Sequence, residues 1–121
     1  MITHVSHAVM YVADQAASLK FYTQQLGFEI VRDEEMFPGA RWIEVVPPGV
    51  QTSIVLSAAA AFDKRPGEGA YLHFSCDDIH ATREQLSAAG VDVSEVTTEP
   101  WGTYITATDP DDHRVMIAQL Q

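Results

Sequence analysis

Residues 3–12 have the pattern of a strand with two different faces, one made of Val5, His7, Val9 and Tyr11 and the other of Ser6, Ala8, Met10 and Val12. We expect the set with Met10 and Val12 to lie under a helix. The set with His7 and Tyr11 would then face solvent or a pocket.

A helical pattern follows this strand. Asp14 suits the helix N-cap, because its carboxylate can accept hydrogen bonds from the first free amides. Apolar residues then recur at helical spacing up to Leu26, and Gly27 suits the left-handed residue that ends a helix. Turns at Phe37-Pro38-Gly39 and Pro47-Pro48-Gly49 separate three further predicted strands, at residues 28–32, 41–46 and 51–57. The first half therefore predicts a βαβββ unit.

The second half repeats this plan. The predicted strand at residues 70–76 places Tyr71 and His73 on one face and apolar side chains on the other. Asp77 or Asp78 caps a helix that Gly90 closes. The remaining strands are predicted near residues 91–96, 103–108 and 113–119, with Asp109-Pro110-Asp111-Asp112 as the turn before the last one.

Two such units cannot each bury a core alone, so we expect them to pack as a pair. The predicted fold class is α+β: two βαβββ modules form a cup-shaped, mixed eight-stranded sheet with the helices outside. A single domain would comprise module 1 at residues 1–57, a linker at 58–69, which lacks periodicity, and module 2 at 70–121. A cup of this kind favours a small-molecule site.

Charge and composition reduce the number of possible classes of function. The 121-residue chain has a formal net charge of −10, which disfavours binding to nucleic acid. The same charge would attract cationic ligands, although acidic surfaces also serve solubility alone. The single cysteine, Cys76, excludes an intramolecular disulfide. With no signal-peptide pattern and no membrane-length apolar stretch, we expect a soluble cytoplasmic protein.

Two stretches resemble the vicinal oxygen chelate superfamily of glyoxalase I, bleomycin-resistance proteins and extradiol dioxygenases. They are His7–Asp14 leading into Phe21-Tyr22-x3-Leu26-Gly27-Phe28, and Asp109-Pro110-Asp111 before the final strand. With the second helix–Gly90 unit, the resemblance covers essentially the whole chain. It implies the glyoxalase/bleomycin resistance fold, a ligand cup, and a homodimer.

The resemblance also implies where a divalent metal would bind in the enzymes of this superfamily. The four ligand positions carry over to His7, Val55, Tyr71 and Met116. Valine cannot coordinate, and a thioether is a poor ligand for hard or borderline ions. We therefore expect no metal and no cofactor. The alternative is one divalent metal ion on a displaced set made of His7, Glu44 and His73.

The favoured function is a metal-free protein that sequesters an antibiotic of the bleomycin type, or another small aromatic or cationic molecule, through stacking and cation–π contacts. The alternative is a metal-dependent lyase, isomerase or dioxygenase, with His7 as the candidate catalytic base. An accessory role beside a neighbouring enzyme is also open. The candidate ligand-binding residues are His7, Tyr11, Trp42, Glu44, Val55, Tyr71, His73, Trp101, Tyr104 and Met116.

Overall fold

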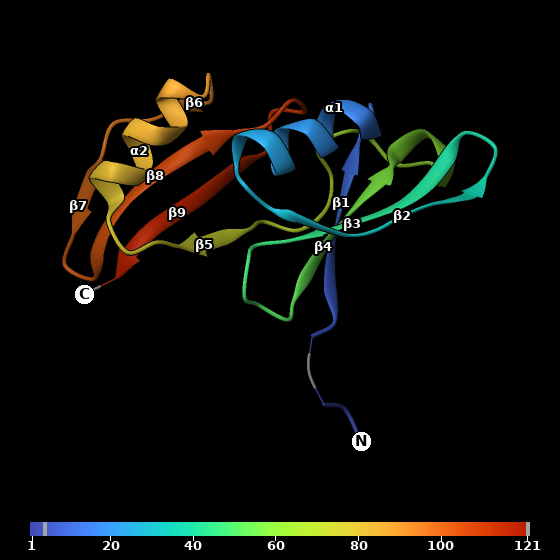
Figure 1. Ribbon diagram of the computed structural model, residues 1–121, viewed down its shortest axis with the longest axis horizontal. Helices are drawn as coiled ribbons and strands as arrows, with labels where there is room; N and C mark the ends of the chain where they lie inside the picture. The colour runs from blue at the N-terminus through green and yellow to red at the C-terminus, as the bar shows by residue number, and fades with distance from the viewer. Residues whose placement is uncertain (4, 121) are drawn as a thin grey trace. The chain divides into compact units, whose positions relative to one another are not determined.

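The computed structural model describes residues 1–3 and 5–120, and the chain divides into two compact units, Met1–Ala70 and Tyr71–Gln121. Unit 1 contains β1 (His7–Val12), α1 (Gln15–Lys20), β2 (Glu29–Phe37), β3 (Ala40–Val46) and β4 (Ser53–Ala58) (Figure 1). Unit 2 contains β5 (His73–Ser75), α2 (Ile79–Ala88), β6 (Asp92–Val93), β7 (Thr97–Glu99), β8 (Gly102–Thr108) and β9 (Arg114–Leu120).

Each unit is built on one mixed sheet. In unit 1 the strand order is β1-β4-β3-β2, and β1 runs parallel to β4. In unit 2 the order is β5-β9-β8-β6, β7 also pairs with β8, and β5 runs parallel to β9. The two βαβββ-type modules confirm the predicted α+β fold class. The cup itself stays a prediction.

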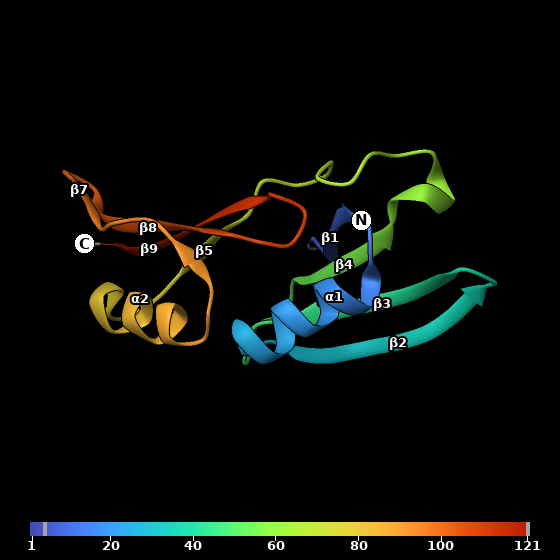
Figure 2. The same ribbon diagram turned by 90° about the horizontal axis from the view of Figure 1, so that it is seen from above.

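The helix covers one face of the sheet in each unit, as Figure 2 shows. In unit 1 the core on this face includes Met10, Val12, Tyr22 and Leu56, none of which is exposed to solvent. In unit 2 the corresponding core is formed by buried residues of α2, β8 and β9, which are Ile79, Leu86, Ile105, Val115 and Ile117. The alternation predicted for β1 is thus confirmed, with Met10 and Val12 on the helix side.

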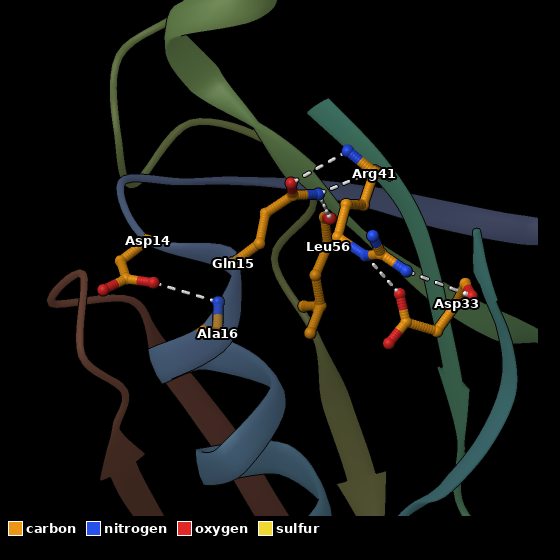
Figure 3. A network of polar contacts seen from close by, with 6 residues as sticks. All are labelled: Asp14, Gln15, Ala16, Asp33, Arg41 and Leu56. Carbon is orange, nitrogen blue, oxygen red and sulfur yellow. Dashed lines mark hydrogen bonds and ion pairs between the residues drawn. The ribbon is translucent and has the colours of Figure 1, made fainter. Parts of the chain in front are cut away.

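The start of α1 is fixed by polar contacts that Figure 3 shows. The carboxylate of Asp14 accepts from the amides of Ala16 and Ala17, which confirms it as the N-cap. The Gln15 side chain donates to the backbone oxygens of Arg41 and Leu56, at 2.7 and 2.8 Å, and accepts from the Arg41 amide. One glutamine therefore bonds to both β3 and β4 and seats the helix on the sheet.

Both predicted helices end at the predicted glycines. After Lys20 the first helix continues as a π-helical segment, Phe21–Gln25, and Gly27 follows with φ of +83°. The second helix has Asp78 as its N-cap and is followed by Gly90, with φ of +86°. A left-handed backbone costs glycine little, which explains why glycine stands at these positions.

The segment predicted as a linker, residues 58–69, belongs to unit 1. Ala59–Phe62 form a short 3-10 helix, and residues 67–70 then run along the outer edge of β1. Gly67 N donates to Tyr11 O, and Ala70 N donates to Val9 O. Gly69 permits this approach, because a Cβ there would lie 2.4 Å from the Val9 oxygen.

Several strand boundaries differ from the prediction. The strand predicted at 3–12 is shorter, because β1 begins at His7. The strand predicted at 70–76 is shorter, because Ala70 bonds to β1 and β5 spans only His73–Ser75. The strand predicted at 28–32 is longer, because β2 continues along β3 to Phe37. The strand predicted at 91–96 is shorter, because only β6 (Asp92–Val93) forms there and Ser94 bonds to Thr106 through its amide and its hydroxyl. A separate strand, β7, follows at Thr97–Glu99, beyond the predicted range. Within the described residues, no helix is long and apolar enough to cross a membrane.

Candidate ligand-binding face of unit 1

The face of the unit 1 sheet that points away from α1 carries a set of polar and aromatic side chains. We call it the open face. The strand registers place Val9 beside Val55 and Val55 beside Glu44, so these residues share a face with His7 on β1 and Trp42 on β3. Four residues predicted from the sequence are therefore brought onto one surface: His7, Trp42, Glu44 and Val55.

Glu44 is held in place by two neighbours. The indole Nε1 of Trp42 donates to Glu44 Oε1 at 3.0 Å, and the hydroxyl of Ser53 donates to Oε2. The Ser53 hydrogen bond is the main reason that the pKa of Glu44 lies below its ordinary value of 4.5. Burial opposes this lowering, while the Trp42 N–H and the nearby His7 and Arg32 add to it. Glu44 is consequently ionised at neutral pH.

His7 lies next to this pair. Its ring meets Trp42 edge-on, with ring centroids 5.6 Å apart and an interplanar angle of 90°. Ser6 Oγ lies 3.2 Å from His7 Nδ1. His7 is only partly exposed, so it can offer a hydrogen bond to a ligand on the open face without being a core residue.

Tyr11 occupies the far end of β1 on the same face. The ammonium of Lys64, from the segment after β4, lies 5.6 Å from the centroid of the Tyr11 ring. This is the geometry of a cation–π contact. Tyr11 therefore presents an aromatic surface, as predicted, but the chain's own cation lies on it.

In unit 2 the register places His73, Met116 and Tyr104 on one face of the sheet, and Trp101 lies next to Tyr104. His73 pairs with Met116, which in turn pairs with Thr106 on β8, so these three share the face that points away from α2. Trp101 stacks on Tyr104, with centroids 5.5 Å apart and an angle of 12°. Trp101 is 46% exposed at the entrance to β8, where the sequence predicts it.

Tyr71 differs from the prediction for the strand at residues 70–76. It lies before β5 and is 92% exposed. The strand is short because residues up to Ala70 follow β1 of unit 1. Tyr71 therefore precedes the paired part of β5, and the first bond to β9 is made by the Leu72 oxygen, which accepts from the Met116 amide.

The donor set at the superfamily's metal positions does not fit a divalent ion. Val55 is a buried valine on the open face, Met116 offers only a thioether, and Tyr71 stands outside its strand. His7 is the one ordinary metal ligand of the four. The displaced set of His7, Glu44 and His73 draws on both units and stays a prediction.

Ser53 is a site residue that the sequence analysis missed. It is 3% exposed, yet its hydroxyl reaches Glu44 across the β3–β4 pair. Its signal in the sequence was a polar residue opening an otherwise apolar strand, Ser53-Ile54-Val55-Leu56. Only the register of β3 against β4 shows that the Ser53 hydroxyl donates to Glu44.

A second polar cluster, Asp109, Asp111 and His113, places ligand-type atoms within 4.8 Å of one another. The Asp109 carboxylate accepts from the amides of Asp111 and His113 and lies 3.1 Å from His113 Nδ1. These contacts build the turn before β9, where Asp112 adopts φ of +63°. These hydrogen bonds explain why the three side chains lie close together: they stabilise the predicted turn.

Comparison with known proteins identifies the family. Residues 4–117 match the model of the Glyoxalase/Bleomycin resistance protein/Dioxygenase superfamily. The chain belongs to this superfamily. The match confirms the resemblance drawn from the sequence.

Three relatives illustrate the similarity. YetH, an uncharacterised protein of Bacillus subtilis (strain 168), is 34% identical over 112 residues, which cover 92% of this chain and 93% of YetH. TnmS3, an antibiotic-binding protein from Streptomyces sp. CB03234, has 31% identity and a TM-score of 0.89, covering 99% of this chain and 98% of TnmS3. A superfamily member from Sphaerobacter thermophilus DSM 20745 has 31% identity and a TM-score of 0.87, with 98% of each chain covered.

Proposed function

We propose that this protein binds a small antibiotic-type molecule without a catalytic metal. The observation that carries the proposal is the open face of unit 1, where a fixed carboxylate, an indole and an imidazole lie together. Such a set can orient a ligand through hydrogen bonds and aromatic contact. The similarity to TnmS3, itself an antibiotic-binding protein, supports the same function.

The donor chemistry at the superfamily's metal positions supports a binding protein over a metal enzyme. A catalytic metal site needs a sufficient number of suitable ligands as well as an open position. Val55 and Met116 do not supply them. The alternative, a metal-dependent lyase, isomerase or dioxygenase, would need the displaced set of His7, Glu44 and His73.

The test joins elemental analysis with a binding measurement. Protein made without an affinity tag or chelator is analysed for nickel, zinc, iron and manganese, and bleomycin binding is followed by calorimetry. We expect metal far below one equivalent per chain together with binding of the drug. About one equivalent of metal, lost when His7 is changed to Ala, would contradict the proposal and favour the enzyme.

Two variants then locate the ligand. His7→Ala should leave the fold intact and weaken binding by about 1 kcal/mol, the worth of one neutral hydrogen bond. Trp101→Ala should weaken an aromatic ligand by a comparable or larger amount, because the stacked pair with Tyr104 is lost. Unchanged affinity in both variants would place the ligand elsewhere.

We also propose that the protein is a homodimer. The outer edge of β2 pairs with no strand among the described residues, and Ile30, Val31 and Phe37 are exposed along it. Edges and apolar surface of this kind favour a partner. Light scattering at micromolar concentration should give twice the 13.3 kDa chain mass, and a monomer would contradict the proposal.

A further inference from the structure

The Glu44 carboxylate on the open face is prepared to accept hydrogen bonds from a ligand. Its two oxygens are each held by one donor, Trp42 from the same strand and Ser53 from β4. A carboxylate has about four acceptor positions, so two donors leave capacity on both oxygens. The side chain is part-exposed, which leaves that capacity accessible.

The charged groups that act on Glu44 are His7 and Arg32, and both lower its pKa. Glu29 pairs with Val46 and Glu34 pairs with Trp42, so both carboxylates lie on the same face as Glu44. Arg32 pairs with Glu44 in the register, but the ion pairs of the described residues do not join the two. The open face therefore carries further carboxylates, and within the described residues no ion pair occupies Glu44.

The open face already holds a cation of the chain itself. The Lys64 ammonium lies over the ring of Tyr11, which shares the face with His7. This contact shows that an aromatic ring of the face is placed to receive positive charge. It is independent of the hydrogen bonds around Glu44.

From these observations we infer that the ligand of the open face is an aromatic organic cation with N–H donors, such as an amidinium or guanidinium group, and that Glu44 is its anchor. The inference rests on the proposed function and names the ligand class. An amidinium presents two parallel N–H donors that match the two oxygens of a carboxylate. The indole of Trp42 would lie beside the aromatic part of such a ligand.

The test uses two probes with the same ring and different charge. 2-Naphthamidine is a cation at pH 7, and 2-naphthamide is its neutral isostere. Each is titrated into labelled protein while the indole N–H resonances of Trp42 and Trp101 are followed by NMR. Because charge-assisted hydrogen bonds exceed neutral ones in strength, we expect the amidine to bind at least about tenfold more tightly and to shift the Trp42 resonance.

Matched variants test whether Glu44 causes the tighter binding of the amidine over the amide. Glu44→Gln should abolish this preference. The control, Glu35→Gln, makes the same charge change on the other face, opposite Arg41, and should retain the preference. Ser53→Ala removes one of the two groups that fix Glu44 and should reduce the preference severalfold. This second variant tests the anchor even if Glu44→Gln does not fold.

The outcomes separate this inference from the proposed function. Equal binding of amidine and amide by the unmodified protein overturns the inference and leaves the binding function standing. A preference that survives in folded Glu44→Gln or is unchanged in Ser53→Ala also overturns it. If neither probe binds, the inference fails, and bleomycin binding decides whether the proposed function fails with it.

Discussion

Unit 1 and unit 2 share a strand order but differ in how far the first strand is paired. In unit 1, β1 pairs with β4 from His7 to Val12, whereas in unit 2 β5 pairs with β9 only from His73 to Ser75. The long pairing of unit 1 places His7, Val9 and Tyr11 in fixed positions on the open face. The short pairing of unit 2 fixes His73 and leaves Tyr71 outside the sheet.

In both units a glutamine side chain connects the helix to the sheet, but in one unit the glutamine is on the helix and in the other it is on a strand. In unit 1, Gln15 at the start of α1 reaches the backbones of β3 and β4. In unit 2, Gln119 on β9 reaches back and accepts from the amide of Ile79 at the start of α2. Both arrangements satisfy backbone groups that the secondary structure leaves open. The repeated fold therefore does not require the repeated residue.

The comparison shows which features follow the repeat and which do not. The helix-facing core recurs, because each sheet must bury one apolar face. The polar chemistry does not recur: the fixed carboxylate with its indole and hydroxyl donors stands on unit 1, and a stacked aromatic pair stands on unit 2. The faces that point away from the helices can differ between the units, because the shared packing of the core does not constrain them.

Truncation of the core should have the largest effect and should affect the two units alike. Leu56→Ala in β4 and Ile117→Ala in β9 each remove a buried side chain from equivalent last strands. Each should lower the free energy of unfolding by about 2–5 kcal/mol, measured by urea denaturation. A loss below about 1 kcal/mol in either variant would show that its unit has no comparable core.

Two glycines provide a smaller test, one in each unit. A Cβ on Gly69 would lie 2.4 Å from the Val9 oxygen, and one on Gly102 would lie 2.5 Å from the Gln119 oxygen. Both residues also have positive φ, so Ala substitution should cost about 1–3 kcal/mol of stability. Gly27→Ala is the control, because its φ is also positive but nothing lies within 4 Å.

We expect Gly27→Ala to lower the free energy of unfolding by about 1 kcal/mol, from backbone strain alone. Thermal denaturation of the three variants distinguishes strain from steric conflict. If Gly69→Ala is no less stable than Gly27→Ala, the segment at residues 67–70 does not lie against β1 as described.

The smallest expected effect is on the pH dependence of stability. It should depend on Glu44 of unit 1 and not on an exposed carboxylate of unit 2. The pKa of Glu44 is lowered in the folded protein, chiefly by the Ser53 hydrogen bond. Its contribution to stability is therefore present above the unfolded pKa of about 4.5 and is lost as pH falls through the lower, folded pKa. His7 on β1 and Arg32 on β2 face the same group.

Glu44→Gln should accordingly flatten the acid limb of a stability–pH curve between pH 7 and 3, relative to the unmodified protein. Glu99→Gln, an exposed residue of β7 in unit 2, is the control and should not change that limb. Parallel curves for Glu44→Gln and the unmodified protein would contradict the fixed carboxylate.

The sequence by itself determined the repeated βαβββ plan and the faces of the first strand. Caps and glycines are local signals, so Asp14, Gly27, Asp78 and Gly90 could be placed without tertiary information. The period-two pattern likewise separated Met10 and Val12 from His7, because neighbouring strand residues point to opposite faces.

Tertiary structure decided how far strands extend and which polar groups meet. Residues 67–70 join unit 1 because their backbone groups find partners on β1, a long-range choice that no local pattern encodes. Ser53 and Glu44 lie on different strands and meet only through the register of β3 against β4. Register depends on the whole sheet, because the side chains that share a face are set by pairing between distant segments.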